Sequence, residues 1–500
     1  MSFPPAKARL RLTLFINALF ALTTVNAYIW PSPQLDALES LRFELDRHQI
    51  APFVQPCTFF IFAVNGPSGR SNVADWIRTA YHDMATYNNV DGTGGMDASI
   101  RFAEEQARAE NAADGFNNTL RLLLPVANRY VSIADALALG AITAIESCGG
   151  PEIAFRGGRI DAASPNAPGV PQPQQDLKSH IASFSRQGFT QKEMISLVAC
   201  GHTFGGVQHA PFPDIVPELN DPKNTESVAH FDSTFVGFDN NVAKEYIAGT
   251  TQNPLVVGRN VTTNSDKRIF ASDGNATMRS FATSPSLFAS TCATLFARML
   301  DTVPRGVKLT EVLTPLPVKP DALELTLDGG KLVFSGQVRF WNMTEDTDGA
   351  RAVLLHWDDR LSKTTSTNTH NVATLTPRRH LLRRPRRAHH RCVTSCLTEP
   401  NASPVKGRFD IAVRNGVSVT RVFLEEEVKD ASGRITVVET DFPRPSPSRA
   451  APNSTVYSLW SMNMTQSSAK RTVGAEINGV KMSTGRLAEL FELPDCPGAA

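Results

Sequence analysis

Two short stretches of the chain carry residue types that could do chemistry. Arg78 and His82 lie four positions apart in the run Arg-Thr-Ala-Tyr-His-Asp, so a helix would present both side chains on one face. A permanent cation beside a titratable base suits a reaction in which a proton moves while negative charge develops. The second stretch, Ala-Cys-Gly-His-Thr, contains His202. An isolated Arg/His pair more often belongs to a solvated helix face, so the surrounding motifs must decide whether this pair is functional.

A glycine-rich turn follows the first stretch and offers oxygen ligands at alternate positions. Asp83, the carbonyl of Gly95 and the side chains of Asp97 and Ser99 could surround a hard cation such as Ca²⁺, which takes many oxygen ligands. An ordinary Asp/Gly turn accounts for the same residues equally well. A second oxygen-rich segment lies at 231–239.

The elements that must position these residues are expected to be mainly helical up to about Asp301. The helix that carries Arg78 is expected to have Asp75 at its cap or in its first turn. The segment 156–174 is rich in Gly, Pro and Asn and is expected to be a loop. Apolar spacing predicts helices at 34–48, 100–115, 118–126, 133–145, 191–201 and 287–300.

The pattern changes after residue 305. Alternating residues on both sides of an Asp-Gly-Gly turn predict a hairpin over 323–334. Further short alternating runs suggest a smaller all-β, sandwich-like domain; they lie at 337–341, 409–413, 434–438 and 456–462. A dense Arg/His insertion at 377–391 interrupts them, and its like charges favour a solvated insertion over an interaction loop.

The amino terminus predicts secretion. Basic residues precede an apolar run at 12–22, and Val-Asn-Ala at 25–27 offers a small-residue cleavage site. The run is shorter than the roughly 20 residues that a bilayer span needs. The predicted organisation is a signal peptide (1–27), a catalytic domain (28–305), a Pro-rich linker (306–321) and a β-rich domain (322–500).

Charge, cysteines and glycosylation sequons narrow the function classes. A net charge of +1 gives no reason to expect nucleic acid as a partner. In a secreted chain the seven cysteines are candidates for disulfides. Cys200 and Cys292 either pair or remain two buried thiols. Asn-x-Ser/Thr sequons agree with secretion; they begin at Asn117, Asn260, Asn275, Asn342, Asn401, Asn453 and Asn463.

Taken in order, the motifs of residues 40–305 resemble the plant-type haem peroxidase superfamily, in the form found in its secreted fungal class. Each motif is weak alone, but the series is specific. The motifs are Arg78-x-x-Tyr-His-Asp83, Gly94-Gly-x-Asp-x-Ser99, Arg101-Phe102 followed by Asn111, Gly150-Pro151, Phe155-Arg-Gly-Gly-Arg159, Gly201-His-Thr203, Phe231-Asp232 with Thr234 and Asp239, and 268–273.

The resemblance implies a mainly α haem-peroxidase fold that binds haem b. His202 would be the axial ligand, and Asp273 would hold its other ring nitrogen. His82 would act as acid and base toward peroxide, with Asn111 keeping it neutral and Arg78 stabilising the developing charge.

The resemblance also implies two structural Ca²⁺ ions and one disulfide. The distal ion would take Asp83, Gly95, Asp97 and Ser99, and the disulfide would join Cys57 to Cys148. Phe231 stands where intracellular relatives carry tryptophan, and Tyr81 stands where Phe or Trp is usual beside the distal histidine. The proximal ion would take Thr203, Asp232, Thr234, Gly237 and Asp239.

Departures from the family pattern predict the substrate class. Manganese-oxidising relatives carry acidic residues where this chain has Arg70, Ala74 and Gln208, and lignin-oxidising relatives expose a tryptophan where it has Leu197. The expected partners are therefore hydrogen peroxide and a small phenolic or aromatic donor at the haem edge of an extracellular monomer, with cell-wall contact through the β-domain. The alternative is a secreted cell-wall or glycan-binding protein with a degenerate peroxidase domain.

Overall fold

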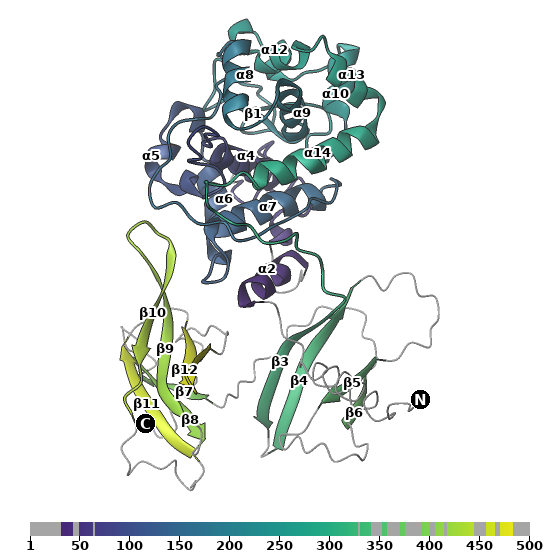
Figure 1. Ribbon diagram of the computed structural model, residues 1–500. Helices are drawn as coiled ribbons and strands as arrows, with labels where there is room; N and C mark the ends of the chain where they lie inside the picture. Colours follow the sequence, from purple (N-terminus) through teal and green to yellow (C-terminus); the bar gives the residue numbers. More distant parts are fainter. Residues whose placement is uncertain are drawn as a thin grey trace, which may run out of the picture. The chain divides into compact units, whose positions relative to one another are not determined.

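The computed structural model divides the chain into two compact units, 1–314 with 425–439, and 315–424 with 440–500 (Figure 1). It describes residues 32–43, 50–63, 66–328, 331–341, 353–357, 371–375, 393–399, 406–414, 418–444, 457–465 and 471–483. The predicted signal peptide and the Arg/His insertion lie outside these residues. Among the residues described, no helix is both long and apolar enough to cross a membrane.

The first unit is mainly helical, as the motif series predicts. One short antiparallel pair, β1 (Gly206–Gln208) with β2 (Val228–His230), lies among its helices. The principal helices are α2 (Pro33–Phe43), α4 (Asn72–Met84), α6 (Gly115–Leu123), α7 (Ile133–Ser147), α8 (Leu177–Arg186), α9 (Gln191–Gly201), α10 (Asn241–Ala248), α12 (Ser265–Ala271), α13 (Ala276–Thr283) and α14 (Pro285–Leu300).

The helix predicted over 100–115 is wrong. The chain there forms three single turns, η2 (Ser99–Arg101), α5 (Ala103–Gln106) and η3 (Ala109–Asn111). Phe102 and Arg108 have extended backbone, with ψ of 135° and 150°, and separate the turns. Regular helix gives way here to side-chain bonds that hold the turns, such as Asn111 Nδ2 to the Glu105 carbonyl at 2.7 Å.

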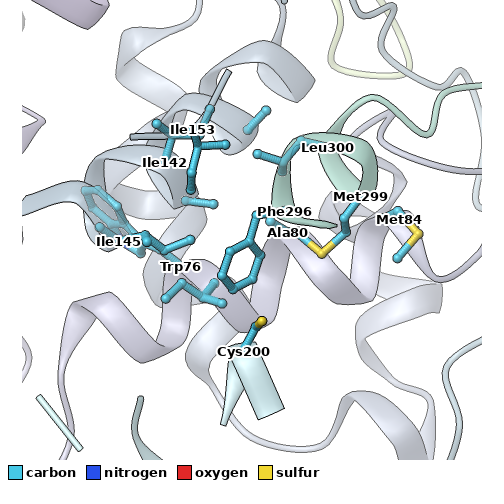
Figure 2. Close-up of a cluster of buried hydrophobic side chains, with 14 of the residues drawn as sticks. Trp76, Ala80, Met84, Ile142, Ile145, Ile153, Cys200, Phe296, Met299 and Leu300 are labelled. Carbon is cyan, nitrogen blue, oxygen red and sulfur yellow. The ribbon is translucent and has the colours of Figure 1, made fainter. Parts of the chain in front are cut away.

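The core of the first unit forms where α4, α7, α9 and α14 meet. Figure 2 shows Trp76, Ala80 and Met84 of α4 among isoleucines of α7 and Phe296, Met299 and Leu300 of α14. Gly140 lets α7 approach Leu123 of α6 closely, because a Cβ at position 140 would lie 2.5 Å from Leu123 Cδ1. The core therefore fixes α4 and α9, the helices that carry the two histidine stretches.

Capping determines where these two helices begin. Ser71 accepts a hydrogen bond from Ala74 N at the start of α4, and Asp75 lies in the first turn. Thr190 and Glu193 form a reciprocal capping box at the start of α9. His202 is the C-terminal cap residue of α9.

The second unit contains antiparallel strands, as predicted. The hairpin at the Asp-Gly-Gly turn is confirmed, with β3 (Val318–Asp328) paired to β4 (Lys331–Phe340) in the register Asp328↔Lys331. β5 (Val353–Trp357) pairs with β6 (Asn371–Leu375). Two larger sheets have the orders β10-β9-β12-β13 and β11-β8-β7. Their strands are β7 (Val393–Glu399), β8 (Lys406–Arg414), β9 (Val419–Lys429), β10 (Ile435–Asp441), β11 (Tyr457–Thr465), β12 (Arg471–Ile477) and β13 (Val480–Ser483).

A separate apolar cluster joins the two larger sheets. Phe409 and Ile411 of β8 and Trp460 of β11 share it with Val422 and Leu424 of β9. A core made by facing sheets is the arrangement of a sandwich. The tip of the β9–β10 hairpin, 425–439, is grouped with the first unit, where Arg129 N donates to Glu427 Oε1 at 2.9 Å.

Candidate active site

One cavity of about 770 Å³ in the first unit brings the two histidine stretches together. Arg78, Tyr81 and His82 from α4 line it, and so do His202 and Phe231. Its volume is typical of sites for large organic ligands. Arg78, His82 and His202, from the two stretches that the sequence singled out, therefore line one cavity.

The hydrogen bonds of His82 fix its orientation and tautomer. Its Nδ1 contacts Asn111 Oδ1 at 2.7 Å, and the Asn111 amide is oriented by its own bond to the Glu105 carbonyl. Because Asn111 presents an oxygen, His82 must donate from Nδ1, which leaves Nε2 as the basic nitrogen. The predicted His82–Asn111 partnership is present in the structure.

Burial and a neighbouring cation keep His82 neutral. Burial, followed by repulsion from the Arg78 guanidinium, lowers the pKa of His82 to about 3. Burial lowers the pKa of Arg78 to about 10, so it stays charged at neutral pH. Arg78 donates to the Ala112 carbonyl at 3.1 Å and lies 4.5 Å from the Phe116 ring centre. The cavity thus holds a neutral base and a fixed positive charge.

Tyr81 lines the same cavity as an aromatic wall. Its ring stacks on Phe184 with centroids 6.1 Å apart. Burial raises the pKa of the Tyr81 phenol, so the hydroxyl remains protonated through the neutral range.

His202 pairs with Asp266, which corrects the prediction of Asp273. His202 Nδ1 lies 2.8 Å from Asp266 Oδ2, and Asn253 Nδ2 donates to the same oxygen at 2.8 Å. Asp266 is fully buried on α12 and lines the cavity. This bond leaves His202 Nε2 available to a ligand, as an axial histidine requires.

Asp273 instead binds the amino-terminal end of α13. Its carboxylate accepts from Ala276 N at 3.0 Å and from Thr277 N at 2.9 Å, so it satisfies free amides at the start of α13. The sequence holds two aspartates seven residues apart, Asp266 and Asp273, and the second stands just before a helix start. The position of Asp273 three residues before Ala276 was the signal that it caps a helix.

Phe231 covers the face of His202. The two rings are nearly parallel, with centroids 4.0 Å apart and planes at 9°. This stacking fixes the imidazole plane, and Phe231 also lines the cavity.

The distal oxygen set is close to His82. Asp83 Oδ2 accepts from Asp97 N and Ala98 N, at 3.0 and 2.8 Å, and its Oδ1 accepts from Ile100 N at 3.1 Å. Gly95 N donates to Thr86 Oγ1 at 3.1 Å. Asp97 and Ser99 both accept from Asn166, which the sequence did not single out.

The proximal oxygen set surrounds Thr203. Thr203 Oγ1 donates to the Asp239 carbonyl at 2.8 Å, and the Thr234 carbonyl accepts from Gly237 N at 2.8 Å. Asp232 is buried, and its Oδ2 has no hydrogen-bond partner. No cluster of three or more His, Cys, Asp or Glu suited to a metal occurs in the described part of the chain. A cation bound here would therefore take hydroxyl and carbonyl oxygens as ligands, together with the carboxylates of Asp232 and Asp239.

A buried arginine occupies the cavity wall where manganese-oxidising relatives carry acid. Arg70 pairs with Asp75 and Asp114 at 2.8 Å and with Glu226 at 3.1 Å. The Gln208 amide oxygen, correctly oriented, also accepts from Arg70. Burial raises the pKa of Asp75 to about 6. These carboxylates are therefore already paired with the Arg70 guanidinium. Leu197, at the position of the exposed tryptophan of lignin-oxidising relatives, is buried in the same wall.

The residues of the cavity fit haem. The wall offers His202, whose Nδ1 is held by a buried carboxylate, together with the flat aromatic surface of Phe231. A histidine nitrogen is one of the axial ligands that hold haem iron, and a cavity of this size could accept a macrocycle.

Two disulfides link distant segments of the first unit. Cys57 pairs with Cys148, as the resemblance implies. Cys200 and Cys292 pair as well, which settles the alternatives left by the sequence and links α9 to α14.

Comparisons with known proteins agree with this geometry. The family model "Peroxidase" matches residues 63–284. A "WSC domain-containing protein" of Arthroderma benhamiae is 40% identical over 351 residues, 69% of this chain and 47% of that protein. The chloroplastic L-ascorbate peroxidase T of Arabidopsis thaliana is 35% identical over 144 residues, 26% of this chain and 32% of its own length. The mitochondrial cytochrome c peroxidase of Yarrowia lipolytica is 34% identical over 136 residues, 26% of this chain and 39% of its own.

The chain spans less than half the length of each of these relatives. The match to the Arthroderma protein is longer than the 63–284 segment, so it extends outside that segment. Residues 63–284 combine the family match with a cavity that holds Arg78, His82 and His202. The chain therefore carries a peroxidase domain of the plant-type haem peroxidase superfamily.

Proposed function

We propose that this chain is a secreted haem peroxidase that reduces hydrogen peroxide while oxidising small phenolic or aromatic donors. One observation carries the proposal: Arg78, His82, His202 and Asp266 all line one cavity, and Asn111 contacts His82 Nδ1 from behind that lining. When bound, haem supplies the iron that accepts peroxide and the electrons that cleave its O–O bond. His82 Nε2 takes the proton from peroxide and returns it to the departing oxygen, so that water leaves.

The other residues orient the groups and balance charge. Arg78 stabilises the negative charge that develops as the O–O bond opens. Asn111 holds His82 in one tautomer, and Asp266 holds the orientation of the His202 ring. The alternative of a degenerate peroxidase domain predicts gaps in this set, whereas both histidines are present and each contacts a side-chain partner, Asn111 for His82 and Asp266 for His202.

The donor class rests on the cavity wall. Arg70 places a buried cation where Mn²⁺ would need free carboxylates, and Leu197 offers no oxidisable ring. The donor class that remains is small aromatic compounds that reach the edge of the cavity. A steady-state comparison of a phenol, Mn²⁺ and a bulky high-potential aromatic with the haem-loaded full chain tests this assignment. We expect turnover of the phenol; preference for Mn²⁺ would contradict it.

Secretion has two supports in the described residues. Two disulfides are typical of an oxidising compartment, and the sequon at Asn117 lies on an exposed part of α6. Expression from a fungal host should deliver the chain to the medium without residues 1–27. Retention in the cell with that segment intact would contradict secretion.

The proximal oxygen set supports a further proposal of one bound Ca²⁺. The buried, unpartnered Asp232 Oδ2 lies in a loop that also presents Thr234 and Asp239, and Thr203 directly follows His202. Oxygen ligands of this kind suit Ca²⁺. Such an ion would hold the loop that positions His202.

A further inference from the structure

The segment 260–263 forms part of the rim of the cavity. Asn260, Thr262 and Thr263 line the cavity, whereas Val261 between them is 73% exposed. Thr262 is exposed as well, and Asn260 is half-buried. A segment that lines a cavity and also meets solvent lies at its opening. The Asn260 amide at this opening belongs to an Asn-Val-Thr glycosylation sequon.

The side-chain nitrogen of Asn260, the atom to which an N-linked glycan is attached, is accessible. Within the described part of the chain, the Asn260 side chain is bonded through Oδ1, which accepts from Thr262 N at 3.1 Å and from Thr262 Oγ1 at 2.6 Å. Nδ2 is not among the buried atoms of this part that lack a partner, so it meets solvent. A glycan added during synthesis can therefore remain on Asn260 in the folded chain.

Hydrogen bonds hold this part of the rim in place. Asn260 is the N-terminal cap residue of η5 (Val261–Thr263). Arg268 of α12 donates to the first two carbonyls of η5, at 3.2 and 3.0 Å. The same guanidinium donates to the Gln175 carbonyl at 2.9 Å, directly after residues 172–174 of the cavity wall. A glycan on Asn260 would thus start from a fixed point beside two segments of the rim.

The sequon at Asn117 offers a comparison elsewhere on the same domain. Asn117 is exposed on α6 and is not among the residues that line the cavity. A glycan on Asn117 would cover the surface of α6 and leave the cavity opening as it is.

We propose that Asn260 carries an N-linked glycan that narrows the opening of the cavity and limits the size of the donor that enters. A glycan is bulky and hydrated, so it excludes large molecules from the space around its point of attachment. This inference rests on the proposed secretion and donor class. It makes the modified rim, together with the cavity wall, the reason why small aromatic compounds are favoured.

Glycopeptide mass spectrometry of the full chain recovered from the medium of a fungal host tests the modification. We expect a glycan on Asn260 in most chains and none at this position in Asn260→Asp, which keeps an oxygen acceptor for Thr262 N. An unmodified Asn260 in chains that have reached the medium would overturn the inference while leaving the proposed secretion intact.

Equilibrium binding of phenol and of bisphenol A, a neutral and bulkier phenol, tests the effect of the glycan. Binding to the haem-loaded full chain is followed by the shift of the Soret band without peroxide, so the result does not depend on turnover. In Asn260→Asp the Kd of bisphenol A, relative to that of phenol, should fall by about three- to tenfold, because a steric clash is removed. Asn117→Asp makes the same charge change away from the cavity and should leave this ratio unaltered.

Enzymatic release of the glycan from the folded chain by an amidase also converts the modified asparagine to aspartate. It therefore provides a second measurement if Asn260→Asp does not fold. An unchanged ratio after removal of the Asn260 glycan, or an equal fall in Asn117→Asp, would overturn the inference. Failure of the chain to oxidise phenols would contradict the proposed function and leave both of these readouts in place.

Discussion

His82 is the base of the proposed reaction, and its environment predicts an unusual pH profile. Burial and Arg78 lower its pKa to about 3, compared with about 6.5 in a solvated histidine. The neutral base is therefore present above about pH 3 and is lost as the pH falls through that value. The rate constant for the reaction with peroxide, measured by stopped flow, should be flat from about pH 4 to 8. An inflection near pH 6.5 assigned to His82 would contradict the structure.

The same shift makes His82 a contributor to acid instability. Between about pH 6.5 and 3 the unfolded chain binds a proton at this residue that the folded chain does not. Folding stability from this group therefore rises with pH across that window.

Asp266 and Asp273 offer a matched pair of substitutions. Asp266→Asn removes the anionic partner of His202 and should raise the reduction potential of the bound haem iron, because less electron density reaches it. Asp273→Asn touches only the start of α13 and should leave the potential unchanged while lowering stability by about 1 kcal/mol. Spectroelectrochemical titration of both variants checks this. A shift in Asp273→Asn alone would restore the original assignment.

The residue types of the distal side were predictable from the sequence, whereas two partners were not. Arg78 and His82 have helical spacing, and Asn111 follows them in the family order. Asp266 could not be distinguished from Asp273 by order alone, because the difference lies in where α12 and α13 begin. Asn166 lies in a loop without periodicity, and only the fold brings it to Asp97.

At the scale of elements, α9 carries His202 at its end and depends on its start. Thr190 and Glu193 satisfy free amides there, so Thr190→Ala should lower the free energy of unfolding by about 1 kcal/mol. Thr294→Ala, on an exposed turn of α14, should change it by less than about 0.5 kcal/mol. Denaturant titration of the haem-loaded chain measures both; equal effects would show that the capping box has no special role.

Long periodic helices were predicted well, and short turns were not. The helix at 191–201 and the helix at 287–300, which begins two residues earlier in the structure, follow from apolar spacing and caps. The segment 100–115 also has helical composition, but its side chains bond to distant loops, such as Arg108 to the Asn166 carbonyl. Such tertiary bonds override local propensity and leave no periodic signal.

At the scale of the whole molecule, two crosslinks close long loops in the first unit. Cys200 and Cys292 are 92 residues apart, and a crosslink that closes a loop of that length stabilises the fold by about 4.6 kcal/mol. Cys200→Ala, Cys292→Ala and the double variant should each lose the same stability, because any of them breaks the bond. Guanidinium unfolding followed by haem absorbance checks this. Additive losses from the two single variants would contradict the crosslink.

The change from helices to strands was also predictable at this scale. Prolines and the Asp-Gly-Gly turn mark it, and β3 pairs with β4 there. The grouping of the β9–β10 tip, 425–439, with the first unit was not predictable, because it depends on contacts such as Arg129 with Glu427.

We propose that His82 acts on peroxide in the cavity where His202 would hold haem. It is tested most directly by the stopped-flow rate of peroxide reaction in the haem-loaded full chain and in His82→Ala. His209→Ala is the control, since that ring contacts the Val216 carbonyl and is not among the residues lining the cavity. We predict an unchanged Soret band and a rate lower by about 10² to 10⁴ in His82→Ala only. A rate equal to that of the unaltered chain would contradict the account.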